Sequence, residues 1–119
     1  MEKKKEELDA WIEKIKDSGK IIIVEGPKDR KALEYFGIKN IMTLKKPLYV
    51  VTEEIAEKYK EAIILTDFDT EGRKLYARLK KDLSRNGVKV DRYFREFLQR
   101  NTKLSHIEGL KTYAENHER

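Results

Sequence analysis

The sequence contains no cysteine and little histidine, proline or tryptophan, with two, two and one residues respectively in a chain of 119. Without cysteine there is no disulfide framework, no thiolate zinc site and no cysteine nucleophile. Two histidines also exclude a histidine-rich metal site, so we expect oxygen ligands for any metal. No apolar stretch is long enough for a membrane span or a signal peptide, and we therefore expect a cytoplasmic protein without membrane contact.

Charged residues are abundant, with 27 Lys and Arg against 22 Asp and Glu, a formal net charge of +5. This excess favours a polyanionic partner. The richness in Lys, Arg and Glu also resembles the composition of hyperthermophile proteins. The length is typical of one globular domain, and we expect residues 1–119 to form a single domain.

Hydrophobic patterning predicts the order of helices and strands. Short apolar runs predict strands at residues 20–25, 41–44, 62–67 and 88–94. Helical spacing predicts helices at residues 3–17, 29–36, 52–59 and 71–85 and a C-terminal helical extension over 95–119. Strands that alternate with helices imply crossover connections. We therefore expect an α/β fold of about four mostly parallel strands with helices on both faces.

Several residues are expected to delimit these helices or to fill the core. Gly37 and the pair Asn86-Gly87 are expected to end two helices. Thr52 is a candidate N-cap, and Ser105 begins a capping-box pattern that predicts a last helix through Tyr113. Aromatic residues on apolar helix faces are expected in the core: Trp11, Tyr35 and Phe36.

Acidic residues follow two of the predicted strands. Glu25 ends the first strand before Gly26, which we expect to allow an unusual backbone angle, and Asp67 and Asp69 end the third. If the two strands are neighbours, three carboxylates meet at the carboxyl edge of the sheet, where open α/β sheets bind ligands. Such a cluster requires a cation, and its oxygen donors suit one or two ions of Mg²⁺, or Mn²⁺. The alternative is that these acids serve only as helix caps.

Two motifs carry a resemblance to a known family: Val24-Glu25-Gly26-Pro27-Lys28-Asp29 and Leu65-Thr66-Asp67-Phe68-Asp69-Thr70-Glu71-Gly72. They resemble the two signatures of the Toprim family, within a signature region of residues 20–94. The resemblance implies a compact, Rossmann-like parallel fold. It also implies that Glu25 acts as general acid or base or as a metal ligand, that Asp67 and Asp69 hold Mg²⁺, and that Gly26 and Gly72 are structural.

Within that family the chain most resembles the small standalone archaeal-type Toprim proteins. Topoisomerases and complete primases require further domains or a zinc-binding region, for which this sequence has neither the length nor the cysteines. The Toprim portion of the 5S ribosomal RNA maturases is similar in size. Residues 105–109 also resemble a downstream Val-Glu-His segment of those maturases, although we expect His106 itself to be structural.

Basic residues are candidates for contact with nucleic acid. Four of them share one face of the fourth predicted helix, beside its leucines: Lys74, Arg78, Lys81 and Arg85. Lys28, Arg30 and Arg73 lie near the acidic motifs in sequence. The alternative is that the helical stripe is simply solvated. Tyr93, Phe94 and Phe97 offer a stacking surface or, alternatively, core.

These observations lead to a functional hypothesis: magnesium-dependent processing of a nucleic-acid phosphodiester, with RNA favoured over DNA through the maturase resemblance. Asp67 and Asp69 would hold the metal, Glu25 would transfer a proton or bind a second ion, and Lys28 would steady the phosphate. Two alternatives remain open. One is a metal-dependent module that binds nucleic acid or a protein without turnover, and the other is a primase-like or topoisomerase-like subunit that needs a partner chain. The sequence leaves the oligomeric state open.

Overall fold

A four-stranded parallel sheet forms the centre of the protein in the computed structural model, which describes residues 2–116. Residues 117–119 of the expected C-terminal extension lie outside that range. The strands are β1 (Ile21–Val24), β2 (Ile41–Thr43), β3 (Glu61–Ile64) and β4 (Lys89–Val90), in the spatial order β2-β1-β3-β4. Ile23 of β1 pairs with Met42 of β2 and with Ile64 of β3. The predicted α/β class is confirmed, and the two strands that precede the acids are neighbours.

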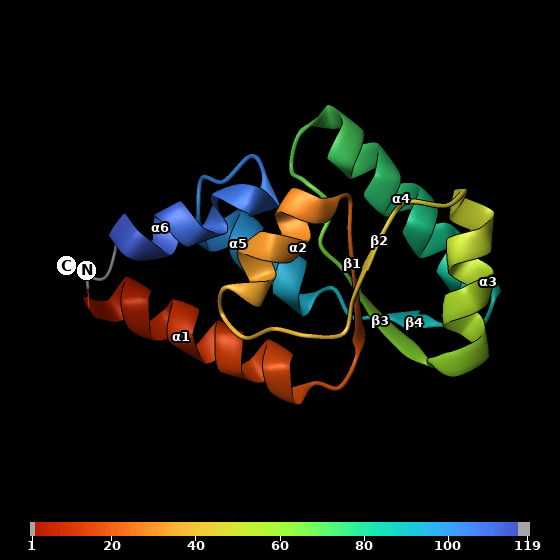
Figure 1. The fold of residues 1–119 in the computed structure, drawn as a ribbon, viewed down its shortest axis with the longest axis horizontal. Coiled ribbons are helices and arrows are strands. Elements are labelled where there is room, and N and C mark those ends of the chain that lie inside the picture. Colours follow the sequence, from red (N-terminus) through yellow and green to blue (C-terminus); the bar gives the residue numbers. More distant parts are fainter. Residues whose placement is uncertain (1, 117–119) are drawn as a thin grey trace.

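Helices cover both faces of the sheet (Figure 1). One face carries α1 (Glu2–Asp17), α2 (Pro27–Glu34), α5 (Tyr93–Asn101) and α6 (Leu110–Asn116), and the other carries α3 (Leu48–Lys58) and α4 (Thr70–Arg85). Successive strand residues point to opposite faces, so β1 sends Ile22 and Val24 into the first cluster and Ile21 and Ile23 into the second. Strands buried on both faces explain the continuous apolar runs in the sequence.

The end of α4 shows how the sequence sets an element boundary. Leu79 and Leu83, one turn apart, are fully buried against the sheet. Gly87 then adopts a positive φ of 80°, and the N–H of Val88 donates to the carbonyl of Leu83 at 2.9 Å. This is the glycine-terminated helix end that the Asn86-Gly87 pair predicts, and the chain turns directly into β4.

The predicted strand over 88–94 is wrong in its second half. Strand β4 ends at Val90, and Tyr93 and Phe94 belong to α5. The carboxylate of Asp91 accepts the N–H of Tyr93 at 3.1 Å, which turns the chain out of the sheet. Phe94 is buried, and its carbonyl accepts the indole N–H of Trp11 at 3.0 Å. The aromatic residues therefore connect α5 to α1 instead of extending a strand.

Three local predictions are also wrong. Helix α3 begins at Leu48 after Pro47, so Thr52 lies inside it and donates its hydroxyl to the carbonyl of Leu48. Ser105 is not an N-cap, because the 3-10 turn Ile107–Gly109 follows His106 without a side-chain cap and leads into α6. Tyr35 is 51% exposed, although we expected it in the core with the buried Trp11.

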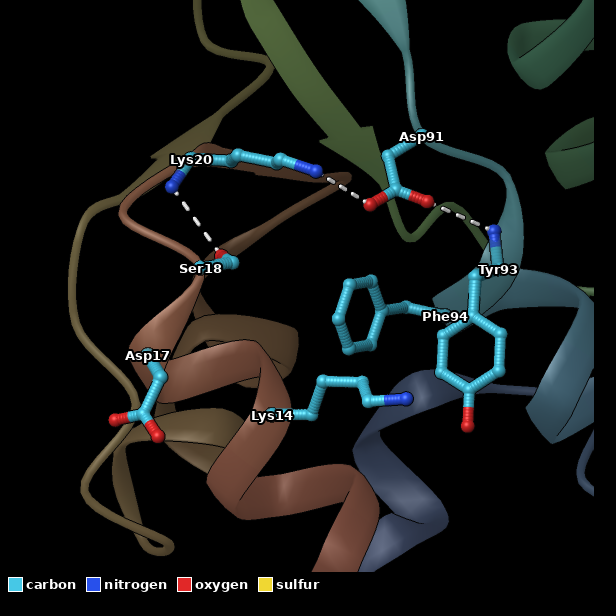
Figure 2. Close-up of a pocket in the computed structure, with 7 residues that line it drawn as sticks. All are labelled: Lys14, Asp17, Ser18, Lys20, Asp91, Tyr93 and Phe94. Atoms are coloured by element: carbon cyan, nitrogen blue, oxygen red, sulfur yellow. Dashed lines mark hydrogen bonds and ion pairs between the residues drawn. The ribbon is translucent and has the colours of Figure 1, made fainter.

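An ionic cluster joins the starts of β1 and β3 to the end of the short strand β4. The ammonium of Lys20 lies 2.7 Å from Asp91 and 2.9 Å from Glu61 (Figure 2 shows the contact with Asp91). A hollow of about 700 Å³ adjoins it, in which the Lys14 side chain points toward the ring of Tyr93. This hollow lies at the opposite edge of the sheet from the acidic motifs.

No helix within residues 2–116 is long and apolar enough to cross a membrane.

Candidate metal centre

Glu25 and Asp67 meet at the carboxyl edge of the sheet, directly after β1 and β3. The ladder between these strands continues through a bond from the Leu65 N–H to the carbonyl of Ile23. Two residues further on, the Asp67 N–H donates instead to the side-chain carboxylate of Glu25, at 2.7 Å. The Glu25 side chain thus replaces its own backbone carbonyl as the acceptor, and its carboxylate lies beside Asp67.

Backbone N–H groups also fix the two aspartates. Oδ1 of Asp69 accepts the N–H of Gly72 at 2.7 Å, so Asp69 is the N-cap of α4. Oδ1 of Asp67 accepts the N–H of Ile107 at 2.8 Å, a bond across 40 positions of the chain. One carboxylate oxygen of each of the three acids therefore accepts a backbone N–H, and this hydrogen bond sets the orientation of the carboxylate.

His106 completes a group that fits a divalent ion. Its Nε2 lies 3.3 Å from Oδ2 of Asp69, and ligand atoms of Asp67, Asp69 and His106 all lie within 4.8 Å of one another. Ligands about 2.1 Å from a common ion are separated by up to about 4.2 Å, so small side-chain adjustments suffice. The two carboxylates suit Mg²⁺ or Mn²⁺, whereas the imidazole nitrogen is a softer ligand than the oxygens that Mg²⁺ prefers. Glu25 lies beside this group and outside it.

The sequence analysis missed His106 as a candidate ligand because it is 37 positions from Asp69 in the chain. The 3-10 turn after His106 brings it to the site: Ile107 donates to Asp67, and the N–H of Phe68 donates to the carbonyl of Ser105 at 2.8 Å. The resemblance of residues 105–109 to a maturase segment was the available signal. That signal gave no position for the side chain relative to the acids.

The two motif glycines have different structural roles. A Cβ on Gly72 would lie 2.0 Å from the carbonyl oxygen of Asp67, so only glycine permits this close approach of α4 to the end of β3. The hydroxyl of Thr66 reinforces the contact by donating to the Gly72 carbonyl at 2.7 Å. Gly26, contrary to our expectation, has an extended backbone with φ of −154° and open space where a Cβ would stand.

A buried arginine that was not among the sequence candidates holds the backbone of Asp67. Arg95 of α5 is 5% exposed and donates from Nη2 to the Asp67 carbonyl at 2.7 Å. Its guanidinium lies over the rings of Phe68 and Tyr76, at 4.6 and 4.7 Å from their centroids. Its buried Nε has no hydrogen-bond partner among the described residues. Burial lowers the pKa of Arg95, and the nearby Glu25 and Asp67 partly counter that effect.

Burial and like charges raise the pKa of two acids at this edge. For Glu25, burial raises the pKa most, and Asp67, Asp29 and Asp69 raise it further, against the hydrogen bond from Asp67. For Asp29, burial and the charge of Asp67 raise the pKa, while the N–H of Gly26, 3.0 Å from its carboxylate, lowers it. The cluster therefore carries unfavourable negative charge that a bound cation would relieve.

The candidate nucleic-acid contacts lie on α2 and α4, the two helices that begin beside the acids. Lys28 is exposed in the first turn of α2, one turn from Glu25. Arg30 donates to the carbonyl of Ile41 at 2.6 Å, so part of its guanidinium is used to hold β2. Arg73 is exposed in the first turn of α4. The remaining candidates are exposed along the same helix, which runs away from the acids: Lys74, Arg78, Lys81 and Arg85.

Comparisons with known proteins agree with this geometry. A family model of the Toprim domain matches residues 20–99. UPF0292 protein MJ1624 of Methanocaldococcus jannaschii is 37% identical over 106 residues, which cover 85% of this chain and 83% of that protein. A UPF0292 protein of Methanosarcina acetivorans is 32% identical over 113 residues, covering 92% and 78%. A solved structure of a protein from Aquifex aeolicus has a TM-score of 0.80 and 38% identity, and covers 85% of this chain and 95% of that chain.

The chain belongs to the Toprim domain family, and its archaeal relatives are small UPF0292 proteins. The resemblance drawn from the two acidic motifs is thereby confirmed, as is the fold it implied. Membership implies a metal-dependent function related to nucleic acid, and Toprim domains generally bind Mg²⁺. The roles of the individual residues stay predictions.

Proposed function

We propose that this protein hydrolyses phosphodiester bonds in nucleic acid with the help of a divalent metal ion, Mg²⁺ or Mn²⁺. The observation that supports this most is the Asp67, Asp69 and His106 group beside Glu25, at the carboxyl edge of a Toprim sheet. RNA is the favoured substrate, because the small maturases that the chain resembles act on RNA. One ion accounts for the three-ligand group, and a second would require Glu25 as its ligand.

In this proposal Asp67, Asp69 and His106 hold the ion. An ion bound there would polarise a phosphate oxygen and lower the pKa of a bound water molecule. The water oxygen would form a new bond to phosphorus as the bond from phosphorus to the leaving sugar oxygen breaks. One proton of the water must be taken up, and the leaving oxygen takes a proton from solvent to become a hydroxyl. Glu25 is the group placed to move that proton, since its carboxylate lies beside Asp67 and only Oε2 accepts a described backbone N–H.

Basic residues near the edge would position the phosphate. Lys28, exposed one turn from Glu25 on α2, can reach toward a strand bound over the acids. Arg73 starts the exposed basic face of α4 on the other side of Asp69. Lys28 is assigned to steady the reacting phosphate, and Arg73 is assigned to hold the adjacent backbone.

One observation favours a second candidate, a metal-dependent module that binds nucleic acid or a partner protein without turnover. All three acids use an oxygen to accept backbone N–H groups of the chain itself, which is what structural caps do. In this alternative the bound ion anchors a phosphate, and no bond is broken.

Cleavage assays distinguish the two candidates. Labelled RNA and DNA are incubated with the protein in Mg²⁺, in Mn²⁺ and in chelator, together with variants Asp67→Asn and Glu25→Gln and the control Glu53→Gln. Asn retains an Oδ1 that can accept the Ile107 N–H, so Asp67→Asn removes the charge and preserves the local fold. Glu53 is exposed on α3, away from the site.

We expect the native protein and the control to cleave the labelled nucleic acid only when metal is present. We expect at least about a hundredfold less cleavage with the two site variants. Metal-dependent binding without product in any metal favours the binding module. Equal cleavage by all four proteins would mean that the product comes from a contaminant, and would remove the support for the site.

A further inference from the structure

The segments that flank the Toprim core enclose a basic groove. Its volume is about 990 Å³, and it lies between the N-terminal turn of α1, the C-terminal end of α5 and helix α6. Its cationic lining residues are Lys4, Arg100 and Lys103. All of its lining residues fall outside the matched residues 20–99, so the groove is built by the additions to the Toprim core.

The charge of the groove has one sign. None of the lining residues within 2–116 is acidic, and none of the three cations forms an ion pair with a described residue. Arg100 and Lys103 are exposed near the end of α5 and just beyond it, three positions apart. Cations around a hollow whose own lining contains no acid repel one another, and a polyanion bound there would relieve that repulsion.

The groove adjoins the metal centre through two residues of its own lining. Leu104 lines the groove and lies two positions before His106, so their Cα atoms are at most about 7 Å apart. Gly109 also lines the groove, and its N–H donates to the carbonyl of His106 at 3.1 Å. The segment that holds His106 3.3 Å from the carboxylate of Asp69 therefore also lines the groove.

We propose that this groove binds the phosphate backbone of the substrate strand next to the phosphodiester at the metal centre. That the bound strand leads to the metal centre rests on the proposed function. That the groove binds a polyanion rests on its own cationic lining. Arg100 and Lys103 contact successive phosphates, and Lys4 closes the groove from α1. A nucleic-acid strand fits better than an acidic peptide, because the adjoining domain belongs to a family related to nucleic acid.

Binding in chelator tests the groove separately from catalysis. The anisotropy of labelled single-stranded RNA and DNA is titrated with the native protein, with the double variant Arg100→Gln and Lys103→Gln, and with a control that replaces Lys58 and Lys60 by Gln. The control removes the same charge from exposed positions at the end of α3 and just beyond it. Unfolding curves of all three proteins verify that the surface changes leave the fold intact.

Each phosphate contact to a single strand contributes about 0.7 to the slope of log affinity against log salt. Loss of two contacts should make that negative slope shallower by about 1.4, which corresponds to roughly 25-fold weaker binding at about 0.1 M salt. The control should retain the native slope. Equal slopes for the groove variant and the control overturn the proposal, and so does stronger binding of labelled polyglutamate than of either oligonucleotide.

Cleavage with Mg²⁺ or Mn²⁺ then separates the two proposals. If no protein cleaves but the groove variant loses binding, the groove proposal stands and the catalytic proposal fails. If the native protein cleaves while the groove variant binds and cleaves like the control, the groove proposal fails and the catalytic proposal stands.

Discussion

Replacement of Gly72 by alanine tests how the motif positions its acids. The new Cβ would lie 2.0 Å from the Asp67 carbonyl oxygen and 2.4 Å from its carbonyl carbon, whereas contacts under 3.0 Å are essentially never seen. The gap must therefore open by about 1 Å, and the Asp67 atoms that the new Cβ would meet belong to the backbone, which cannot rotate away as a side chain could. Overpacking of a buried site costs typically about 1–3 kcal/mol, and the lack of a flexible side chain that could give way puts this case at the upper end.

The displacement should also affect the metal site. The Gly72 N–H holds Asp69 and its carbonyl accepts the Thr66 hydroxyl, so movement of this residue strains two short hydrogen bonds. We expect Gly72→Ala to lower the free energy of unfolding in guanidinium by about 3 kcal/mol. We also expect it to weaken Mn²⁺ binding, measured by calorimetry at a temperature where the variant is folded.

The matched control is Gly26→Ala, the other motif glycine. Its extended backbone accepts any residue, and nothing in the protein occupies the space of the new Cβ. Alanine is a weaker N-cap than glycine, so a loss of about 0.5 kcal/mol is expected there. If Gly72→Ala proves as stable as Gly26→Ala, the fold does not require the close approach of α4 to Asp67, contrary to this prediction.

Three further predictions follow from other contacts. Arg95→Lys should destabilise the fold by about 2 kcal/mol in denaturant, because lysine keeps the charge and loses the planar guanidinium between two rings; an unchanged midpoint would contradict this. Asp91 and Glu61 raise the pKa of Lys20 above 10.5, so the stabilisation from this ion pair should be complete below that pH and disappear as pH rises through the folded pKa. The difference in free energy of unfolding between the native protein and Lys20→Met should therefore shrink between pH 8 and 12. A difference that stays constant over that range would contradict this prediction. Mn²⁺ at about 100 times its Kd should stabilise the native protein by about 2.7 kcal/mol and stabilise Asp67→Asn far less, as measured from thermal midpoints; equal shifts would place the ion elsewhere.

Much of the fold follows from local patterning because the strands are buried on both faces. Continuous apolar runs at Ile21–Val24 and around Ile63 cannot be helical surface, and the leucines of α4 repeat at helical spacing. The boundary between β4 and α5 was not predictable from propensity, since Tyr93 and Phe94 favour strands in isolation. Their helical state depends on the hydrogen bond from the Tyr93 N–H to Asp91 and on the partner Trp11, which is 83 positions from Phe94 in sequence.

The same distinction holds at the candidate site. Glu25, Asp67 and Asp69 belong to two neighbouring strand ends, so parallel pairing alone predicts their convergence. His106 and Arg95 reach the site through tertiary contacts that no short-range pattern encodes: a bond to Ile107 across 40 positions and a bond from Arg95 to the Asp67 carbonyl across 28. Sequence reasoning therefore found the acids and missed the residues that surround them.

The position of a bound ion decides whether Asp67, Asp69 and His106 form a metal site. Crystals of the native protein soaked in Mn²⁺ give anomalous scattering that locates the metal directly. We expect a peak bonded to carboxylate oxygens of Asp67 and Asp69 and to Nε2 of His106. Peaks only at other acids, or none at a concentration that raises the thermal midpoint, would contradict it.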